Sequence, residues 1–278
     1  MTPRNHLLFV MLPPRSPRPT ALLTNRIIHG NCMKIMKGMP SESVDLIVTD
    51  PPFMQLREME IHRRINPQKY KTNVLERTIT GMAWDSYANL GSYLNFIENW
   101  FSQSARVLKK GGHLTTFFDR LKFTYLAEFC EKYGMLVRQG LFWILKNPVP
   151  RAGRFDFMNA VAPIFWATKG TRSRKFATFN CGTTPTPNYR YAPICGGKQR
   201  QHPTQKPQEI IEWLVEYLTN EGDLVLDPFV GSGTTAVACR LLNRNYIGIE
   251  ISDEYCKIAE SRLKNIPSRP EAFAEAEG

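Results

Sequence analysis

Short, mostly continuous runs of apolar residues alternate along the chain with longer stretches of helical periodicity. The runs are rich in β-branched and aromatic residues, which is typical of strands buried on both faces of a parallel sheet. We predict strands at residues 44–49, 113–118, 141–146, 161–168, 224–227 and 246–251. A strand buried on both faces needs helices above and below it, so the pattern predicts a sheet covered on two sides.

Apolar residues with a spacing of three or four fill the stretches between these runs. One helix is expected to have Ser92 as its N-cap and to end before Gly111, and another to begin at Pro207 and end before Gly222. The first helix has an apolar face formed by Tyr93, Phe96, Ile97, Trp100, Ser104 and Leu108. Further helices are predicted over residues 122–133, 234–242 and 253–264. This alternation predicts an α/β fold with a doubly wound, mostly parallel sheet of the Rossmann-like type.

The composition fits a single domain with unstructured ends. The chain has 278 residues, of which 42% are hydrophobic and 22% charged, as in ordinary globular proteins. We assign the domain to residues 25–265, with a Pro- and Arg-rich disordered extension at 1–24 and a flexible tail at 266–278. No apolar run reaches the length of a membrane span, and the apolar patch near the N-terminus is too short for a secretory signal.

Six cysteines form no CxxC pair and no Cys/His ladder. Cys181, Cys195 and His202 match the spacing of no standard zinc site, so we predict no metal site. Cysteines without a pairing pattern are usual in a reducing compartment, and we therefore expect a cytoplasmic protein.

Positive charge is concentrated in two segments. The formal net charge of +11 favours a polyanionic partner. Residues 157–208 contain no Asp or Glu, so their basic residues create a local positive field. These basic residues are Lys169, Arg172, Arg174, Lys175, Arg190, Lys198, Arg200 and Lys206. Residues 54–84 also carry several Arg and Lys residues, and loops of this length are usually functional or disordered.

The segment DPFVGSGTT, residues 227–235, indicates a nucleotide-type cofactor. A predicted strand ends at Asp227, and Gly231 and Gly233 permit a tight loop that a ligand can approach closely before the next helix. The following strand ends near Glu250, whose carboxylate is able to accept both hydroxyls of a ribose. A loose GxGxxA match leaves NAD open, whereas the lack of a Gly-Lys-Ser/Thr sequence excludes a phosphate-binding P-loop.

The predicted strand at 44–49 runs directly into the sequence DPPF. Two prolines fix the backbone and remove its donors, which makes a rigid elbow at a strand end. Because the carboxyl ends of parallel strands meet at one edge of a sheet, Asp50, Asp227 and Glu250 are expected along one rim. By itself, DPPF is also compatible with a strand-terminating turn and a core Phe53.

Three motifs together resemble a known family. DPPF at 50–53, HPTQKP at 202–207 and DPFVGSGTT at 227–235 resemble, in this order, the β class of DNA amino-methyltransferases. These enzymes methylate exocyclic nitrogens of DNA bases, and the resemblance covers residues 25–265 by motif order. It implies S-adenosylmethionine (SAM) as the cofactor.

The resemblance also implies which residues contact this cofactor. The family pattern places Asn31 where relatives have an aspartate beside the adenine, and Thr204 and Lys206 in the segment that closes over the methionine part. Glu250 matches the acid that binds the ribose. The full implied set is Asn31, Asp50, Thr204, Lys206, Asp227, Phe229, Gly231, Gly233, Thr234, Thr235 and Glu250.

The implied chemistry begins with a base flipped out of the duplex. The Asp50 carboxylate would accept one hydrogen bond from the exocyclic amine and the Pro51 carbonyl the other, which aims the nitrogen lone pair at the sulfonium methyl. Phe53 would stack on the base. The catalytic residues are therefore expected to be Asp50, Pro51, Pro52 and Phe53. Asp in the first position resembles the N6-adenine subset, so adenine is the expected target.

Double-stranded DNA is the partner that the resemblance implies. The target-recognition region is expected at about 169–201, and the loop at 54–84 is expected to clasp DNA beside the flipped base. The candidate contacts are Arg63, Arg64, Lys69, Arg172, Arg174, Lys175, Arg190, Lys198 and Arg200. A homodimer and a cognate endonuclease of a restriction–modification pair are further expectations for this class.

Other functions stay open on the sequence alone. Methylation of N4 of cytosine shares every step above. Methylation of a free amide or of RNA is disfavoured, because relatives with those activities typically carry Asn-Pro-Pro. A non-catalytic DNA-binding module would not need an intact DPPF, and an NAD-linked oxidoreductase would explain the glycine loop and Glu250 but not DPPF or the acid-free segment.

Overall fold

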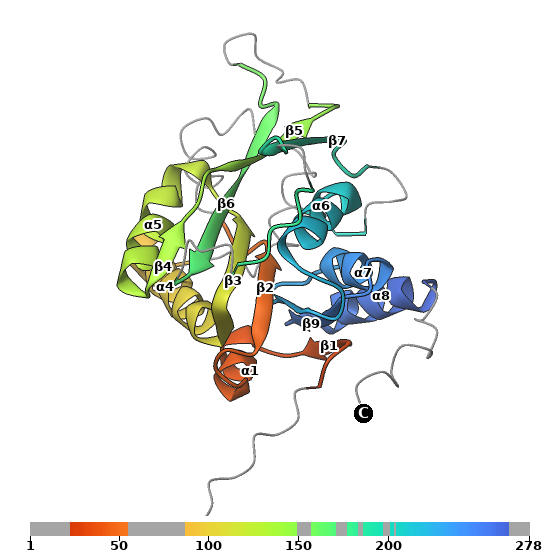
Figure 1. Ribbon diagram of the computed structural model, residues 1–278, viewed down its shortest axis with the longest axis horizontal. Coiled ribbons are helices and arrows are strands. Elements are labelled where there is room, and N and C mark those ends of the chain that lie inside the picture. Colours follow the sequence, from red (N-terminus) through yellow and green to blue (C-terminus); the bar gives the residue numbers. More distant parts are fainter. Residues whose placement is uncertain are drawn as a thin grey trace, which may run out of the picture.

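The computed structural model describes residues 23–54, 87–148, 157–170, 177–182, 186–196, 201–202 and 204–266. Most of the extension predicted at 1–24, the loop at 54–84 and the tail at 266–278 lies outside these residues. The elements are β1 (Arg26–His29), α1 (Cys32–Gly38), β2 (Val44–Thr49), α4 (Leu90–Val107), β3 (Leu108–Phe117), the 3₁₀ turn η2 (Arg120–Lys122), α5 (Phe123–Lys132), β4 (Met135–Val137), β5 (Leu141–Leu145), β6 (Val161–Lys169), β7 (Tyr189–Ala192), α6 (Gln208–Leu218), β8 (Leu224–Asp227), α7 (Thr234–Leu241), β9 (Asn245–Glu250) and α8 (Asp253–Lys264). Figure 1 shows these helices on either side of a central sheet.

The described strands form one mixed, nine-stranded sheet. Its order is β1-β9-β8-β2-β3-β6-β5-β7, and β4 pairs with β6 off this path. Neighbours from β1 to β3 run parallel. In contrast, β6 runs antiparallel to β3, β4 and β5. The predicted α/β fold with a mostly parallel sheet is confirmed. The prediction missed β1, β4 and β7, which have only three or four residues each.

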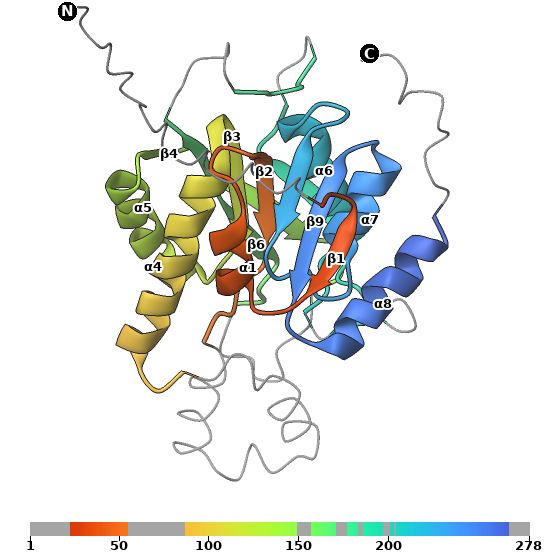
Figure 2. The same cartoon turned by 90° about the horizontal axis from the view of Figure 1, so that it is seen from below.

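Helices cover both faces of the sheet, as the continuous apolar runs predict. Helices α1, α4 and α5 lie on one face, and α6 and α7 on the other with α8 beside α7 (Figure 2). In β2, Leu46 and Val48 belong to the core cluster with α6 and α7, whereas Ile47 belongs to the cluster with α1 and α4. Both faces of this strand are buried, so no polar alternation is possible in it. None of the described helices is long and apolar enough to cross a membrane.

The predicted start of α4 was wrong, whereas its end at Val107 lies before Gly111 as expected. Its N-cap is Asn89 rather than Ser92, and the two residues form a reciprocal capping box. The Ser92 amide donates to the Asn89 side chain at 2.8 Å, and the Asn89 amide donates to the Ser92 hydroxyl at 3.2 Å. Gly111 lies inside β3 with a φ of 86°. A Cβ on Gly112 would lie 2.9 Å from the Asp45 carbonyl oxygen, so this glycine permits close contact with β2.

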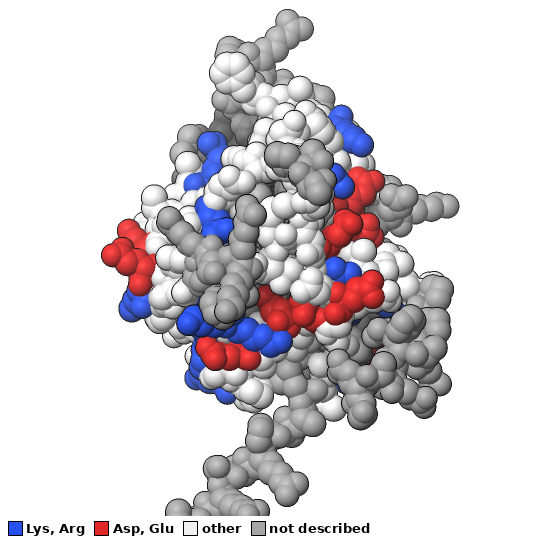
Figure 3. All heavy atoms as spheres, in the orientation of Figure 1, with Lys and Arg blue, Asp and Glu red and all other residues white. Residues whose placement is uncertain are grey.

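The described basic residues of the segment 157–208, which contains no Asp or Glu, have different surroundings. Lys169 donates to the Leu108 carbonyl at 2.7 Å and Lys206 pairs with Asp50, so both are engaged within the molecule. Arg190 is exposed on the edge strand β7. The face drawn in Figure 3 carries basic and acidic side chains side by side. The other predicted DNA contacts lie outside the described residues, namely Arg63, Arg64, Lys69, Arg172, Arg174, Lys175, Lys198 and Arg200.

His113 anchors the segment after β6 to the middle of the sheet. Its side chain is buried, with Nε2 2.7 Å from the Thr178 carbonyl oxygen and Nδ1 3.2 Å from Trp166 Nε1. A tryptophan indole only donates, so Nδ1 must accept and the proton of the neutral ring lies on Nε2, which donates to Thr178. Burial lowers the pKa of His113 to about 4.

We expect His113 to make the folded protein less stable in acid. Because its pKa is near 6.5 when unfolded and about 4 when folded, the unfolded chain binds more protons between these values. Its contribution to the free energy of unfolding should therefore be complete above pH 6.5 and should fall by about 2 to 3 kcal/mol by pH 4.5. Urea denaturation above pH 6.5 and at pH 4.5 measures this loss in the free energy of unfolding.

The control for this experiment is the His113→Asn variant, which cannot titrate. Asp227, whose pKa is raised to about 6, acts in the opposite direction over the same range, so only the difference between the two proteins carries the test. Equal losses of stability on acidification would contradict the assignment, as would an NMR titration of His113 centred near 6.5.

Candidate active site

The candidate site lies where the chain reverses direction across the sheet. β2 and β8 are neighbours, but the chain leaves β2 through α4 toward β3 on one face and leaves β8 through α7 toward β9 on the other. In such sheets a crevice opens at the carboxyl ends of the two strands. Asp50 follows β2, Asp227 ends β8 and Glu250 ends β9, and all three line one cavity, as predicted from the strand ends.

Asp227 connects three parts of this site. Its Oδ1 accepts hydrogen bonds from the Thr49 hydroxyl at 2.7 Å and the Phe229 amide at 3.1 Å, and its Oδ2 accepts from the Thr235 hydroxyl at 2.6 Å. The residue is 5% exposed, and burial raises the pKa of its carboxyl to about 6. Because both oxygens already have donors from the chain, Asp227 holds β2, the glycine loop and the start of α7 together.

Gly231 and Gly233 have different functions in the loop. Both have positive φ, 52° and 84°, which favours glycine. A Cβ on Gly231 would meet the His202 ring at 3.5 Å, whereas a Cβ on Gly233 would lie 2.7 Å from Cβ of Ala259 in α8. Gly231 lines the cavity and Gly233 does not. Gly233 provides close packing against α8, and its cofactor contact stays a prediction of the resemblance.

Arg262 supports the same loop, and no sequence pattern predicted this contact. Its Nη1 donates to the Ser232 carbonyl at 2.7 Å and lies 3.2 Å from the Thr234 hydroxyl. Arg262 comes from α8, about thirty residues further along the chain, and belongs to no motif. Only the packing of α8 against α7 brings it to the loop.

Glu250 and Asn31 lie in the part of the cavity expected to hold a nucleoside. Glu250 accepts hydrogen bonds from the Gly231 amide at 3.0 Å and the Ser252 amide at 2.9 Å, one on each carboxylate oxygen. These bonds fix the carboxylate and leave lone pairs for ribose hydroxyls. Asn31 caps α1, since its side-chain oxygen accepts from the Lys34 amide at 3.2 Å. In the structure, that oxygen therefore caps the helix.

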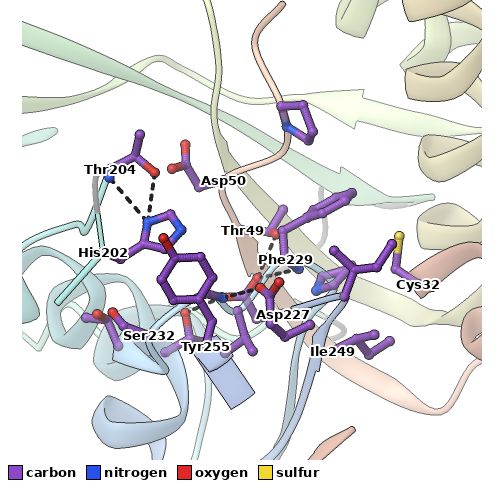
Figure 4. A pocket seen from close by; sticks show the side chains of 18 of the residues that line it. Cys32, Thr49, Asp50, His202, Thr204, Asp227, Phe229, Ser232, Ile249 and Tyr255 are labelled. Atoms are coloured by element: carbon purple, nitrogen blue, oxygen red, sulfur yellow. Dashed lines mark hydrogen bonds between the residues drawn. The ribbon is translucent and has the colours of Figure 1, made fainter. Parts of the chain in front are cut away.

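Asp50 extends from the end of β2 to the edge of the cavity. Its Oδ2 accepts a hydrogen bond from Lys206 Nζ, whereas its buried Oδ1 has no partner among the residues that the structure describes. Burial raises the pKa of Asp50, and the Lys206 charge opposes this shift. Figure 4 shows Asp50 and Thr204 near each other above Asp227. Asp50 lines the cavity, and a buried acceptor without a donor would be satisfied by a ligand N–H that reaches it.

The DPPF elbow is fixed through its own carbonyl groups. The Tyr93 hydroxyl donates to the Pro52 carbonyl at 3.0 Å, and Lys122 Nζ donates to the Phe53 carbonyl at 3.1 Å. Lys122 is itself paired with Asp119 at 2.5 Å. Tyr93 was predicted only as a core residue of a helix, and Lys122 was not predicted to support the site.

The predicted base-stacking position of Phe53 is not seen in the structure. Its ring packs edge-on against Phe118, with centroids 6.1 Å apart, and contacts both core clusters. Pro51 is buried, and neither Pro51 nor Phe53 lines the cavity, whereas Pro52 does. In this arrangement Phe53 is a core residue, which is the alternative that DPPF by itself left open.

The described part of HPTQKP closes the other side of the cavity. The His202 ring lies edge-on to Tyr255, with centroids 4.3 Å apart, and its Nδ1 accepts from the Thr204 amide at 3.2 Å. Thr204 and Lys206 both line the cavity, as do Phe229, Thr234 and Thr235. Tyr255 comes from α8 and was missed, because its distance along the chain gives no signal. Within the described ranges, no group of three or more His, Cys, Asp or Glu residues is arranged to hold a metal.

Fold and site together define a Rossmann-like α/β protein with a ligand cavity at its reversal point. The chain belongs to the N6/N4 DNA methylase family, whose family model it matches over residues 44–261. It is 31% identical over 261 residues to the Type II methyltransferase M.HinfI of Haemophilus influenzae, covering 88% of this chain and 70% of that protein. To the Type II methyltransferase M.HpaI of Haemophilus parainfluenzae it is 29% identical, covering 87% of this chain and 74% of that protein. The chain is therefore a DNA methyltransferase.

Solved structures support the same fold. The M1.HpyAVI–SAM complex has a TM-score of 0.64 and 26% identity, with 86% of this chain and 98% of that chain covered. The PvuII DNA methyltransferase, described as cytosine-N4-specific, has a TM-score of 0.65, with 87% of each chain covered. At 20% identity, the latter similarity shows the fold alone.

The two glycines give a matched test of the loop geometry. We expect Gly231→Ala to lower the free energy of unfolding by about 1 to 2 kcal/mol, because alanine is strained at positive φ. Gly233→Ala should lose roughly 1 to 3 kcal/mol more, because its Cβ would also collide with Ala259. Urea denaturation of both variants measures the difference, and equal losses would show that α8 does not restrict Gly233.

Proposed function

We propose that this protein transfers a methyl group from SAM to N6 of adenine in double-stranded DNA. The observation that carries the proposal is the Asp50 carboxylate, whose Oδ1 is buried at the cavity edge without a partner among the described residues. An enzyme that methylates an exocyclic amine needs such an acceptor for the amine N–H. The choice of adenine depends on Asp in the first position of DPPF, which resembles the N6-adenine subset.

The residues of the cavity fit this cofactor. Glu250 is fixed at the end of β9 and offers lone pairs to the two ribose hydroxyls. Phe229 and Ile249 provide apolar walls for the adenine, and Asn31 lies at the same end. Thr204 and Lys206 line the same cavity, and the resemblance assigns them to the methionine part. When bound, SAM supplies a methyl group made electrophilic by its sulfonium.

Asp50 and the elbow would act mainly by orientation. Asp50 Oδ1 would accept one hydrogen bond from the flipped-out amine and the Pro51 carbonyl would accept another, which turns the nitrogen lone pair out of the ring plane. The nitrogen then forms the N–C bond as the C–S bond breaks, and the C–S electron pair stays on sulfur. The methylated nitrogen finally releases one proton to Asp50 or water. Orientation of this kind accounts for much of the acceleration.

Recognition of DNA is proposed for residues 169–201, with Arg190 as its described, exposed basic residue. Phosphate contacts would supply most of the affinity. Lys169 and Lys206 are not proposed to contact DNA phosphates, since both already bind groups within the chain. A homodimer and a cognate endonuclease stay predictions of the resemblance.

Asp50→Ala should separate chemistry from cofactor binding. We expect the rate of methyl transfer to fall roughly 100-fold or more, because an acceptor that orients the amine is lost. Calorimetry should show SAM affinity changed by no more than about threefold, since Asp50 is not proposed to provide the main cofactor bonds. Asp253→Ala, an exposed aspartate of α8, is the control and should retain full activity.

The product of the unmodified enzyme identifies the base. Mass spectrometry of digested DNA should show N6-methyladenine, whereas N4-methylcytosine would overturn the choice of adenine and leave the rest of the site intact. Full activity of Asp50→Ala would instead overturn the proposed role of the carboxylate.

Arg190→Ala should weaken DNA binding for all sequences and lower the slope of log affinity against log salt by about 1. The control is Lys257→Ala on α8. This helix contacts β1, and β1 and β7 lie at opposite edges of the sheet (Figure 1). Fluorescence anisotropy over a range of salt concentrations measures both. The same slope in both variants and the unmodified protein would exclude a phosphate contact at Arg190.

A further inference from the structure

Lys206 binds the carboxylate that the proposed mechanism depends on. Its Nζ donates to Asp50 Oδ2 and to the Thr204 carbonyl oxygen at 3.1 Å. The two side chains of the ion pair are 15% and 20% exposed, so water screens the pair only partly. Nζ also lies 5.0 Å from the ring centroid of Phe117 and 5.8 Å from that of Phe53. Aromatic faces at these distances favour a cation.

This contact makes the two oxygens of Asp50 different. Oδ2 is occupied by the lysine, whereas Oδ1 is buried and has no partner among the described residues. An orphaned buried acceptor costs free energy until a donor reaches it. One particular oxygen of Asp50 therefore lacks a donor among the described residues, and the position of the lysine decides which one.

We infer that Lys206 is a positioning residue, which binds Asp50 Oδ2 and keeps the carboxylate ionised with Oδ1 directed to the amino group of the target base. This inference rests on the proposed function, because it assigns Asp50 the role of acceptor for that amine. It differs from the implied role of Lys206, which is contact with the methionine part of the cofactor. The two roles predict different effects of pH.

The charges around the cavity explain why a cation is needed. Burial raises the pKa of Asp50, and the nearby Asp50 and Asp227 charges disfavour each other. Among the described residues that line the cavity, Lys206 is the only lysine or arginine. The other titratable groups there are Cys32, Tyr87, His202, Asp227, Glu250 and Tyr255. Without Lys206, two carboxylates would remain near each other with less compensation, and Asp50 would take up a proton more readily.

The test compares Lys206→Met with Lys206→Arg in the full chain. Single-turnover methyl transfer is measured from about pH 5 to 9 at saturating SAM and DNA. Lys206→Met should shift the acid limb upward by about one pH unit or more, which corresponds to a roughly tenfold lower rate on that limb. Lys206→Arg keeps the positive charge and should keep the limb near that of the unmodified enzyme.

The matched control is Lys109→Met. Lys109 also pairs with an aspartate of the same region of chain, Asp45 in β2, at 2.8 Å, but this pair does not line the cavity. Its removal should leave the pH profile unchanged. If Lys206→Met does not fold, Lys206→Gln carries the same test, because it also removes the charge.

A second readout does not depend on activity. In protein with ¹³C-labelled aspartate and no cofactor, the Asp50 carboxyl resonance is assigned by its loss in Asp50→Ala. Its titration midpoint should be at least about one pH unit higher in Lys206→Met than in the unmodified protein. An unchanged midpoint together with weaker SAM binding would overturn the inference and leave a cofactor contact. Full activity of Asp50→Ala would instead overturn the proposed function.

Discussion

The site depends first on the buried Asp227 carboxylate and its three donors. Through the Thr49 hydroxyl it fixes the end of β2, through the Phe229 amide the glycine loop, and through Thr235 the start of α7. Thr49 immediately precedes Asp50, so the position of Asp50 depends on this bond. A buried carboxylate is tolerated because each oxygen has hydrogen-bond donors. The Asp227 side chain therefore connects the segments that meet where the chain reverses direction across the sheet.

Asp50 and Asp227 show how similar groups take different functions from their surroundings. Asp227 has donors on both oxygens and binds the frame together. Asp50 has a donor on Oδ2 alone, so it retains a vacant acceptor at the cavity edge. The satisfied carboxylate stabilises the fold, and the half-satisfied one is the acceptor that the proposed function assigns to the substrate amine. Burial raises the pKa of both, and for Asp50 the charge of Lys206 counteracts this effect.

The sequence predicted those features that depend on short-range patterns. The buried strands β2, β8 and β9 and the acids that follow or end them, Asp50, Asp227 and Glu250, follow from apolar runs and from the geometry of parallel sheets. The strands β1, β4 and β7 are short and partly exposed, so no continuous apolar run marks them, whereas the equally short β8 is buried throughout. The contacts of Arg262 and the close packing of Gly233 could not be predicted, because both depend on how α8 packs against the loop.

The elbow is rigid because both layers of the protein hold it. Tyr93 from α4 and Lys122 from η2 bind its carbonyl groups on one side, and Lys206, which precedes α6, binds its aspartate on the other. Phe53 joins the two layers, since its ring contacts both core clusters. Acceptors placed before the substrate arrives need no reorganisation during the reaction, which is the main source of electrostatic catalysis. The partly buried Phe53 thus packs the elbow that carries Asp50 against both core clusters.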